Sequence, residues 1–146
     1  MPPSNPLSLA AGSVLYIKGY SSRGHAPKNK YAYILGNQGP AVVLAFLVST
    51  QPIHRGTGLD KEVVVIPRLA TSIFSQESYI QCFHVVERLD ANDLNAAHSR
   101  GEIEYKGRLR TTYLYKVKEV VRNSDVLSQQ EIMDCLAILP PDEQDE

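Results

Sequence analysis

Two lysines and a run of hydroxyl and amide side chains stand at the ends of two apolar segments. KNKYAYIL (residues 28–35) opens with Lys28 and Lys30, and FLVSTQPIHR (residues 46–55) follows its apolar part with Ser49. If the two segments are hairpin partners they run antiparallel, so the start of the first lies beside the end of the second. The sequence therefore predicts that Lys30 and Ser49 share one polar, cationic cluster.

Further cations and imidazoles flank both segments. Ammonium and guanidinium groups bind phosphate oxygens, hydroxyl and amide groups donate hydrogen bonds to them, and imidazoles titrate near neutral pH. The predicted anion site comprises Arg23, His25, Lys28, Lys30, Ser49, Thr50, Gln51, His54 and Arg55.

Motifs of other chemistries are missing from the sequence. The four histidines form no HxH or HxxxH pair, the two cysteines form no CxxC pair, and no GxSxG, Walker or GxGxxG motif occurs. We therefore predict no metal site and no cofactor, and a familiar hydrolase triad has no support.

Composition indicates one soluble globular domain. The chain has 146 residues, 43% of them hydrophobic and 21% charged. The longest apolar run, residues 41–48, is too short to cross a bilayer, and the N-terminus does not resemble a signal peptide. Cys82 and Cys135 lie in apolar patterns, which favours reduced core thiols and a cytoplasmic protein without membrane contact.

Charge is divided unevenly along the chain. Residues 1–59 hold five Lys and Arg and no Asp or Glu, whereas residues 60–146 hold ten basic and sixteen acidic residues. This split indicates either a positive face for an anionic partner or a set of separately solvated charges.

Hydrophobic periodicity predicts strands in the first half and helices in the second. Strands are expected at 13–18, 31–35, 41–49, 62–66 and 78–86, with a hairpin turn at 36–39, and such short strands favour a small, closed or partly closed barrel. Helices are expected at 90–98, 109–121 and 128–139, with a brief strand near 103–105. A strand remains the alternative for 109–121, because its residues also favour β-structure. Asp90 is expected to cap the first helix, and Ser128 with Glu131 forms a capping box for the last.

Four segments in this order resemble the MazF/PemK (Kid) toxin family of the CcdB/MazF superfamily, in its divergent PemK-like branch. They are AGSVLYIK (11–18), KYAYIL (30–35), FLVSTQ (46–51) and LSQQEIMDCLAIL (127–139). SYIQC (78–82) and the LDxxDL that follows are similar to the same branch. The resemblance covers most of residues 11–139.

The resemblance implies an α+β fold: a small SH3-like barrel of about five to seven mainly antiparallel strands with two or three helices, the last two at the C-terminus. It implies one domain over 12–139. Composition predicts a flexible N-terminus (1–11), rich in Pro and Ser, and an acidic disordered tail (140–146). Family members are usually homodimers, and many are metal-independent endoribonucleases held inactive by an antitoxin protein. The family's functional Arg and Thr correspond to Lys30 and Ser49, and Tyr31 stands where Pro is usual.

Cleavage of single-stranded RNA through its 2′-hydroxyl needs a base, donors for the charge on phosphorus and an acid for the leaving oxygen. We assign Lys30 to the phosphorane charge, Ser49 or Thr50 to a non-bridging oxygen, and His25, or else His54, to proton transfer. The loop holding Arg23 and His25 is expected to act as a lid, with Tyr20 or Tyr31 stacking on bases.

Two alternatives stay open. A non-enzymatic barrel relative would bind a protein such as DNA gyrase, and a catalytically degenerate module would bind RNA without cutting it. Lys30 in place of Arg favours both alternatives, because an ammonium does not grip phosphate with two parallel bonds.

Overall fold

Seven strands form one antiparallel sheet in the computed structural model of the chain, which describes residues 7–20, 28–39, 41–51, 56, 58–85 and 89–141. The strands are β1 (Ser13–Tyr20), β2 (Lys28–Gln38), β3 (Val42–Ser49), β4 (Val63–Ile66), β5 (Ser78–Val85), β6 (Leu89–Asp90) and β7 (Ile103–Arg108). The helices are α1 (Ala91–Ser99), α2 (Thr112–Arg122) and α3 (Gln129–Ile138), with a short 3₁₀ turn η1 (Asp60–Glu62) before β4.

The predicted fold class is confirmed. The chain is α+β, its strands pair antiparallel, and the last two helices lie near the C-terminus. The strand order is β4-β5-β3-β2-β1-β7, and β6 also pairs with β3. Because this path ends at β4 and β7, the sheet is open within the described residues, a barrel-like arrangement without a hydrogen-bonded seam.

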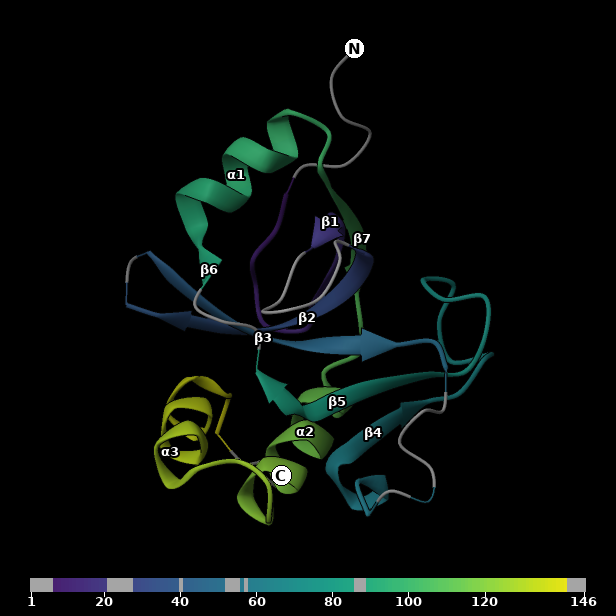
Figure 1. Ribbon diagram of the computed structural model, residues 1–146, viewed down its shortest axis with the longest axis vertical. Helices are drawn as coiled ribbons and strands as arrows, with labels where there is room; N and C mark the ends of the chain where they lie inside the picture. Colours follow the sequence, from purple (N-terminus) through teal and green to yellow (C-terminus); the bar gives the residue numbers. More distant parts are fainter. Residues whose placement is uncertain are drawn as a thin grey trace, which may run out of the picture.

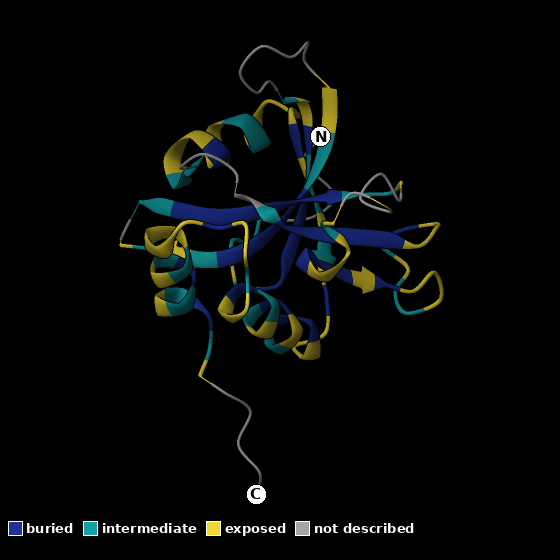
Figure 2. Cartoon of the chain, turned by 60° about the horizontal axis from the view of Figure 1, so that its bottom comes forward, coloured by how far each residue is buried: buried dark blue, intermediate teal, exposed yellow. Residues whose placement is uncertain are grey.

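Strand alternation gives the sheet two apolar faces. Along β2, Tyr33 and Leu35 belong to the core cluster that packs against α2 and α3, whereas Ala32 and Ile34 belong to the cluster that includes Leu94 of α1. Figure 1 shows α1 on one side of the sheet and α2 and α3 on the other. Figure 2 shows that the central strands between these helices are largely buried. The middle of the sheet is therefore held from both sides.

Local capping explains where α1 and α3 begin. The Asp90 side chain accepts hydrogen bonds from the backbone N–H groups of Asn92 and Asp93, at 2.8 and 3.1 Å. Ser128 and Glu131 form the predicted capping box of α3. Helix α2 buries Tyr113, Leu114, Val117 and Val121 along one stripe, which settles residues 112–122 as helix rather than strand.

Strand β2 is longer than the sequence predicts. Strand β2 begins at Lys28, because its first residues pair with the end of β1, and it continues through Gly36 to Gln38. Gly36 lies at an irregularity in the register with a φ of 146°, and α3 packs closely over it. The turn expected at 36–39 is therefore replaced by strand up to Gln38, and Gly39 and Ala41 lie in turns.

Both cysteines are core thiols. Cys82 and Cys135 are free and buried, in the cluster beneath α2 and α3. Burial raises the pKa of the Cys82 thiol, and it raises the pKa of the Cys135 thiol to about 12. Neither thiol is an activated nucleophile at neutral pH. None of the helices, within the described residues, is long and apolar enough to cross a membrane.

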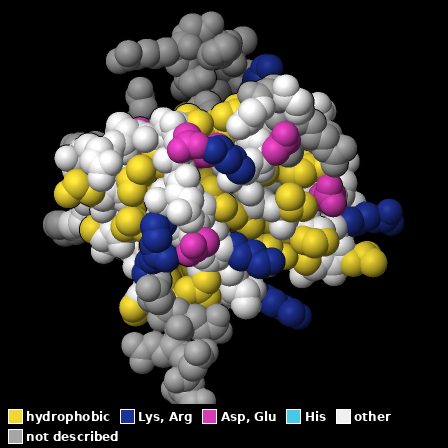
Figure 3. Space-filling model, turned by 90° about the horizontal axis from the view of Figure 1, so that it is seen from below, with side chains coloured by type: hydrophobic (Ala, Val, Ile, Leu, Met, Phe, Trp, Pro, Cys, Tyr) yellow, Lys and Arg dark blue, Asp and Glu magenta, His cyan; other side chains and the backbone are white. Residues whose placement is uncertain are grey.

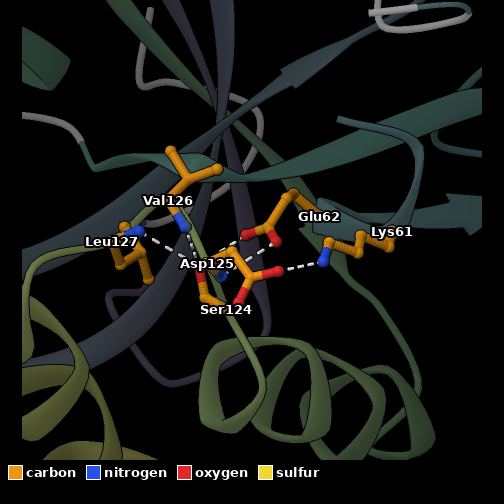
Figure 4. Close-up of polar contacts among 6 residues, drawn as sticks. All are labelled: Lys61, Glu62, Ser124, Asp125, Val126 and Leu127. Carbon is orange, nitrogen blue, oxygen red and sulfur yellow. Dashed lines mark hydrogen bonds and ion pairs between the residues drawn. The ribbon is translucent and has the colours of Figure 1, made fainter. Parts of the chain in front are cut away.

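A buried carboxylate fastens the α2–α3 loop to the sheet. Glu62 is 1% exposed and accepts hydrogen bonds from the Ser124 hydroxyl at 2.5 Å and from the Asp125 backbone N–H at 3.2 Å (Figure 4). The same hydroxyl accepts from the N–H groups of Val126 and Leu127. Lys61 pairs with Asp125 at the exposed edge of this cluster. Glu62 thus supplies the acceptor for a hydroxyl and a backbone N–H group of the loop between α2 and α3.

We predict that Glu62→Ala lowers the free energy of unfolding by about 1–3 kcal/mol, because it leaves a hydroxyl and a backbone N–H without their acceptor. Urea denaturation followed by circular dichroism measures the change. Lys61→Ala is the matched control, because its ammonium is exposed and its pairing with Asp125 is screened by water. Equal, small effects of both substitutions would contradict the assigned role of Glu62.

Candidate functional site

Pairing of β2 with β3 brings the two predicted segments together. Tyr31 lies opposite Val48 in the antiparallel register, so the neighbouring Lys30 and Ser49 lie at adjacent positions of the two strands. Both are half-buried, in contrast to the exposed Lys28. The expected proximity of Lys30 and Ser49 is therefore present in the structure.

A pocket of about 460 Å³ lies at this end of the strands. Its volume falls within the range of about 300–1,000 Å³ that small-molecule sites occupy. The described residues that line it come from β1, β2, β3 and the segment directly after β3, and none of them belongs to a helix. They are Tyr16, Lys28, Asn29, Lys30, Tyr31, Val48, Ser49, Thr50 and Gln51.

The pocket collects residues from both faces of the sheet. Strand alternation assigns Lys30 to the face of Ala32 and Ile34, which α1 covers, and assigns Tyr31 to the opposite face. Because the strands end here, side chains of both faces reach the same rim. A cationic side and an aromatic side therefore meet in one pocket.

No described residue neutralises the cations of the pocket. No ion pair or side-chain hydrogen bond joins Lys28 or Lys30 to another residue in the part of the chain that the structure describes. An ammonium without a protein partner retains all three donors for an anion. Two such groups beside hydroxyl and amide groups form a receptive site for a phosphate.

Ser49 has a structural hydrogen-bond pattern of its own. Its hydroxyl donates to the backbone carbonyl of Gln51 at 2.9 Å and accepts from the backbone N–H of Gln51 at 3.0 Å. Such a turn fixes the backbone at the pocket edge but uses the only hydroxyl proton. Thr50, half-buried and in the same pocket, makes no such bond among the described residues and is the readier donor to a ligand.

An aromatic row forms the second side of the pocket. The Tyr16 and Tyr31 ring centroids are 4.9 Å apart, and Phe74 contacts Tyr31 edge-on at 5.0 Å. Burial raises the pKa of the Tyr31 phenol, and the nearby Tyr16 and Glu104 raise it further. The phenol is therefore neutral at physiological pH, so it can donate a hydrogen bond but does not serve as a general base.

Three lining residues were not predicted from the sequence. Tyr16 lies opposite Tyr31 across the β1–β2 pair, and Asn29 accepts a hydrogen bond from the Gly19 backbone N–H at 3.0 Å. Val48 is the buried neighbour of Ser49. The alternation of Val14, Tyr16 and Lys18 would place Tyr16 on the face of Tyr31 once the pairing of β1 with β2 is known.

Other predicted residues lie elsewhere. Tyr20 pairs with Lys28 at the end of β1 and packs against the α1-side core, and it does not line the pocket. Arg23, His25, His54 and Arg55 lie outside the described residues. The lid and the proton-transfer groups expected from the sequence therefore stay predictions.

Charges elsewhere on the surface are mixed. The face seen from below, formed around α2, α3 and β4, shows lysine, arginine and acidic side chains interspersed with apolar ones (Figure 3). Over the described ranges, no three His, Cys, Asp or Glu side chains are grouped so as to hold a metal ion.

Comparison with known proteins identifies no relative. The chain matches no protein-family model, and it matches no curated protein either.

We predict that Ser49→Ala speeds hydrogen exchange of the backbone amide of Gln51 several-fold. The variant loses the hydroxyl that accepts a hydrogen bond from this N–H at 3.0 Å. Heteronuclear NMR at fixed pH measures the exchange. Ser49→Thr keeps the hydroxyl and is the matched control, with exchange close to that of the unmodified protein. Unchanged exchange in the alanine variant would show that the turn does not depend on Ser49.

Proposed function

We propose that this chain is the toxin of a toxin–antitoxin system, a metal-independent endoribonuclease that cleaves single-stranded RNA. The observation that carries the proposal is the pocket where the unpaired Lys28 and Lys30 meet Ser49, Thr50 and Gln51 beside two tyrosines. Phosphate needs cationic donors, and an unpaired base needs an aromatic surface. The resemblance of the strand ends and of the last helix to MazF/PemK proteins supports the same function.

The proposed reaction is an internal transesterification. The 2′-oxygen attacks phosphorus, the bond from phosphorus to the 5′-oxygen breaks, a base takes the 2′-hydroxyl proton, and an acid protonates the departing 5′-oxygen. The products are a 2′,3′-cyclic phosphate and a 5′-hydroxyl. Both nucleophile and leaving group belong to the RNA, so the protein supplies positioning, charge and proton transfer.

Each pocket residue has a role in this proposal. Lys30 neutralises the charge that grows on the phosphorane, and Lys28 binds a neighbouring phosphate. Thr50 donates to a non-bridging oxygen, while Ser49 holds the backbone of Gln51 in place. His25, or else His54, is the proposed proton-transfer group.

Partners follow from the same proposal. Single-stranded RNA is the substrate, a cognate antitoxin protein inhibits the chain, and a homodimer in the cytoplasm is the working form. A small antitoxin reading frame beside the gene would support this assignment, and co-expression of its product should relieve growth arrest caused by the chain.

We predict that the protein cuts a long RNA in the presence of EDTA and that Lys30→Ala slows cleavage roughly 10²- to 10³-fold, the cost of losing one preorganised charge donor. Lys30→Arg should retain cleavage, because guanidinium binds phosphate in a two-bonded geometry. Gel analysis of 5′-labelled RNA measures the rate, and the ends are identified by their 2′,3′-cyclic phosphate.

Lys116→Ala is the matched control, because this exposed lysine lies on α2 over the Tyr113 ring, and no helix residue lines the pocket. It should leave cleavage unchanged. Intact RNA together with salt-dependent binding would instead identify an RNA-binding module. Intact RNA without binding, together with loss of DNA supercoiling by gyrase, would identify the protein-binding alternative.

A further inference from the structure

The aromatic side of the pocket continues onto β7, where it meets a carboxylate. Tyr16 lies opposite Tyr31 on one side and opposite Glu104 on the other. Directly opposed side chains of an antiparallel pair lie about 4.5–5.5 Å apart at Cβ. The charge of Glu104 also contributes to the raised pKa of the Tyr31 phenol, as its place beside Tyr16 leads one to expect.

Lys18 completes this group. It stands two residues after Tyr16, and its Nζ lies 4.0 Å from the Glu104 carboxylate and 3.1 Å from the Gly101 carbonyl. Both charged side chains are about half exposed. The ammonium has donors left for a ligand, and the carboxylate has lone pairs left to accept from one.

We propose that Tyr16, Lys18 and Glu104 form a subsite for a guanine base beside the phosphate pocket, an inference that rests on the proposed RNA-binding function. The Tyr16 ring supplies the stacking surface. Glu104 accepts from the N1–H and the N2 amino group of guanine, and Lys18 donates to O6.

The donor pattern selects guanine over the other bases. A carboxylate accepts two parallel hydrogen bonds, and the Watson–Crick edge of guanine offers two adjacent donors with an acceptor beside them. Adenine and cytosine offer a single amino group with an acceptor ring nitrogen next to it. Uracil offers one N–H between two carbonyls. These bases leave the carboxylate partly unsatisfied or facing an acceptor.

The sign of one substitution separates this subsite from an ordinary surface carboxylate. A carboxylate without a role in recognition repels RNA, so its removal strengthens the binding of every sequence. A carboxylate that accepts hydrogen bonds from guanine strengthens the binding of RNA that carries guanine at this position. Its removal therefore weakens the binding of that RNA alone. Glu102→Gln is the matched control, because Glu102 is an exposed glutamate two residues away that pairs with Arg100.

The experiment measures binding of fluorescein-labelled 2′-O-methyl pentanucleotides UUXUU, with X as G, A, C or U, by anisotropy. The methyl group blocks the attacking oxygen, so binding is read without cleavage. We expect guanine to bind roughly ten-fold more tightly than the other bases, and Glu104→Gln to abolish this preference. Glu102→Gln should retain it. Tyr16→Leu should weaken all four oligomers roughly ten-fold, while Tyr16→Phe retains binding.

Each outcome decides the question. Equal binding of the four oligomers, or tighter binding of all of them by Glu104→Gln, overturns the guanine subsite. The phosphate site then still stands, provided that Lys30→Ala weakens binding. Failure of every oligomer to bind at low salt overturns the proposed function, and the subsite with it. Melting curves for each variant identify any loss of folding.

Discussion

The antiparallel register of β2 and β3 is the constraint on which the site depends. It sets Tyr31 opposite Val48 and thereby places the start of one strand beside the end of the other. Two lysines and a Ser-Thr-Gln run, about twenty residues apart in sequence, become neighbours through this pairing. A slip of one residue would turn Lys30 to the other face of the sheet and separate it from Ser49.

The helices and the α2–α3 loop pack around this strand pair away from the described rim residues. Helix α1 packs on one face of the sheet, α2 and α3 pack on the other, and Glu62 ties the loop between the last two helices to the sheet. Among the described residues, those that line the pocket come from strands and from the segment after β3. Charged and polar side chains can therefore lie at the strand ends without interrupting either core.

Much of this arrangement follows from local sequence signals. Asp90 and Ser128 mark helix starts because capping depends on residues a few positions away, and the α2 stripe is readable from its spacing. Lys30 and Ser49 could be paired because a hairpin is also local. The sequence could not predict the places of Tyr16, Asn29 and Glu104, because these depend on the pairing of β1 with β2 and with the distant β7. The β1–β2 and β1–β7 pairs both contain register irregularities, so the alternation of residues along β1 does not predict which residues lie opposite each other.

The central claim is that the rim pocket of β2 and β3 receives RNA, and chemical-shift mapping tests it most directly. Titration of labelled protein with a 2′-O-methyl oligonucleotide should shift the amide signals of residues 28–31 and 48–51 together, along with that of Tyr16. Shifts confined to the amides of α2 and α3, with residues 28–31 and 48–51 unmoved, would contradict the account.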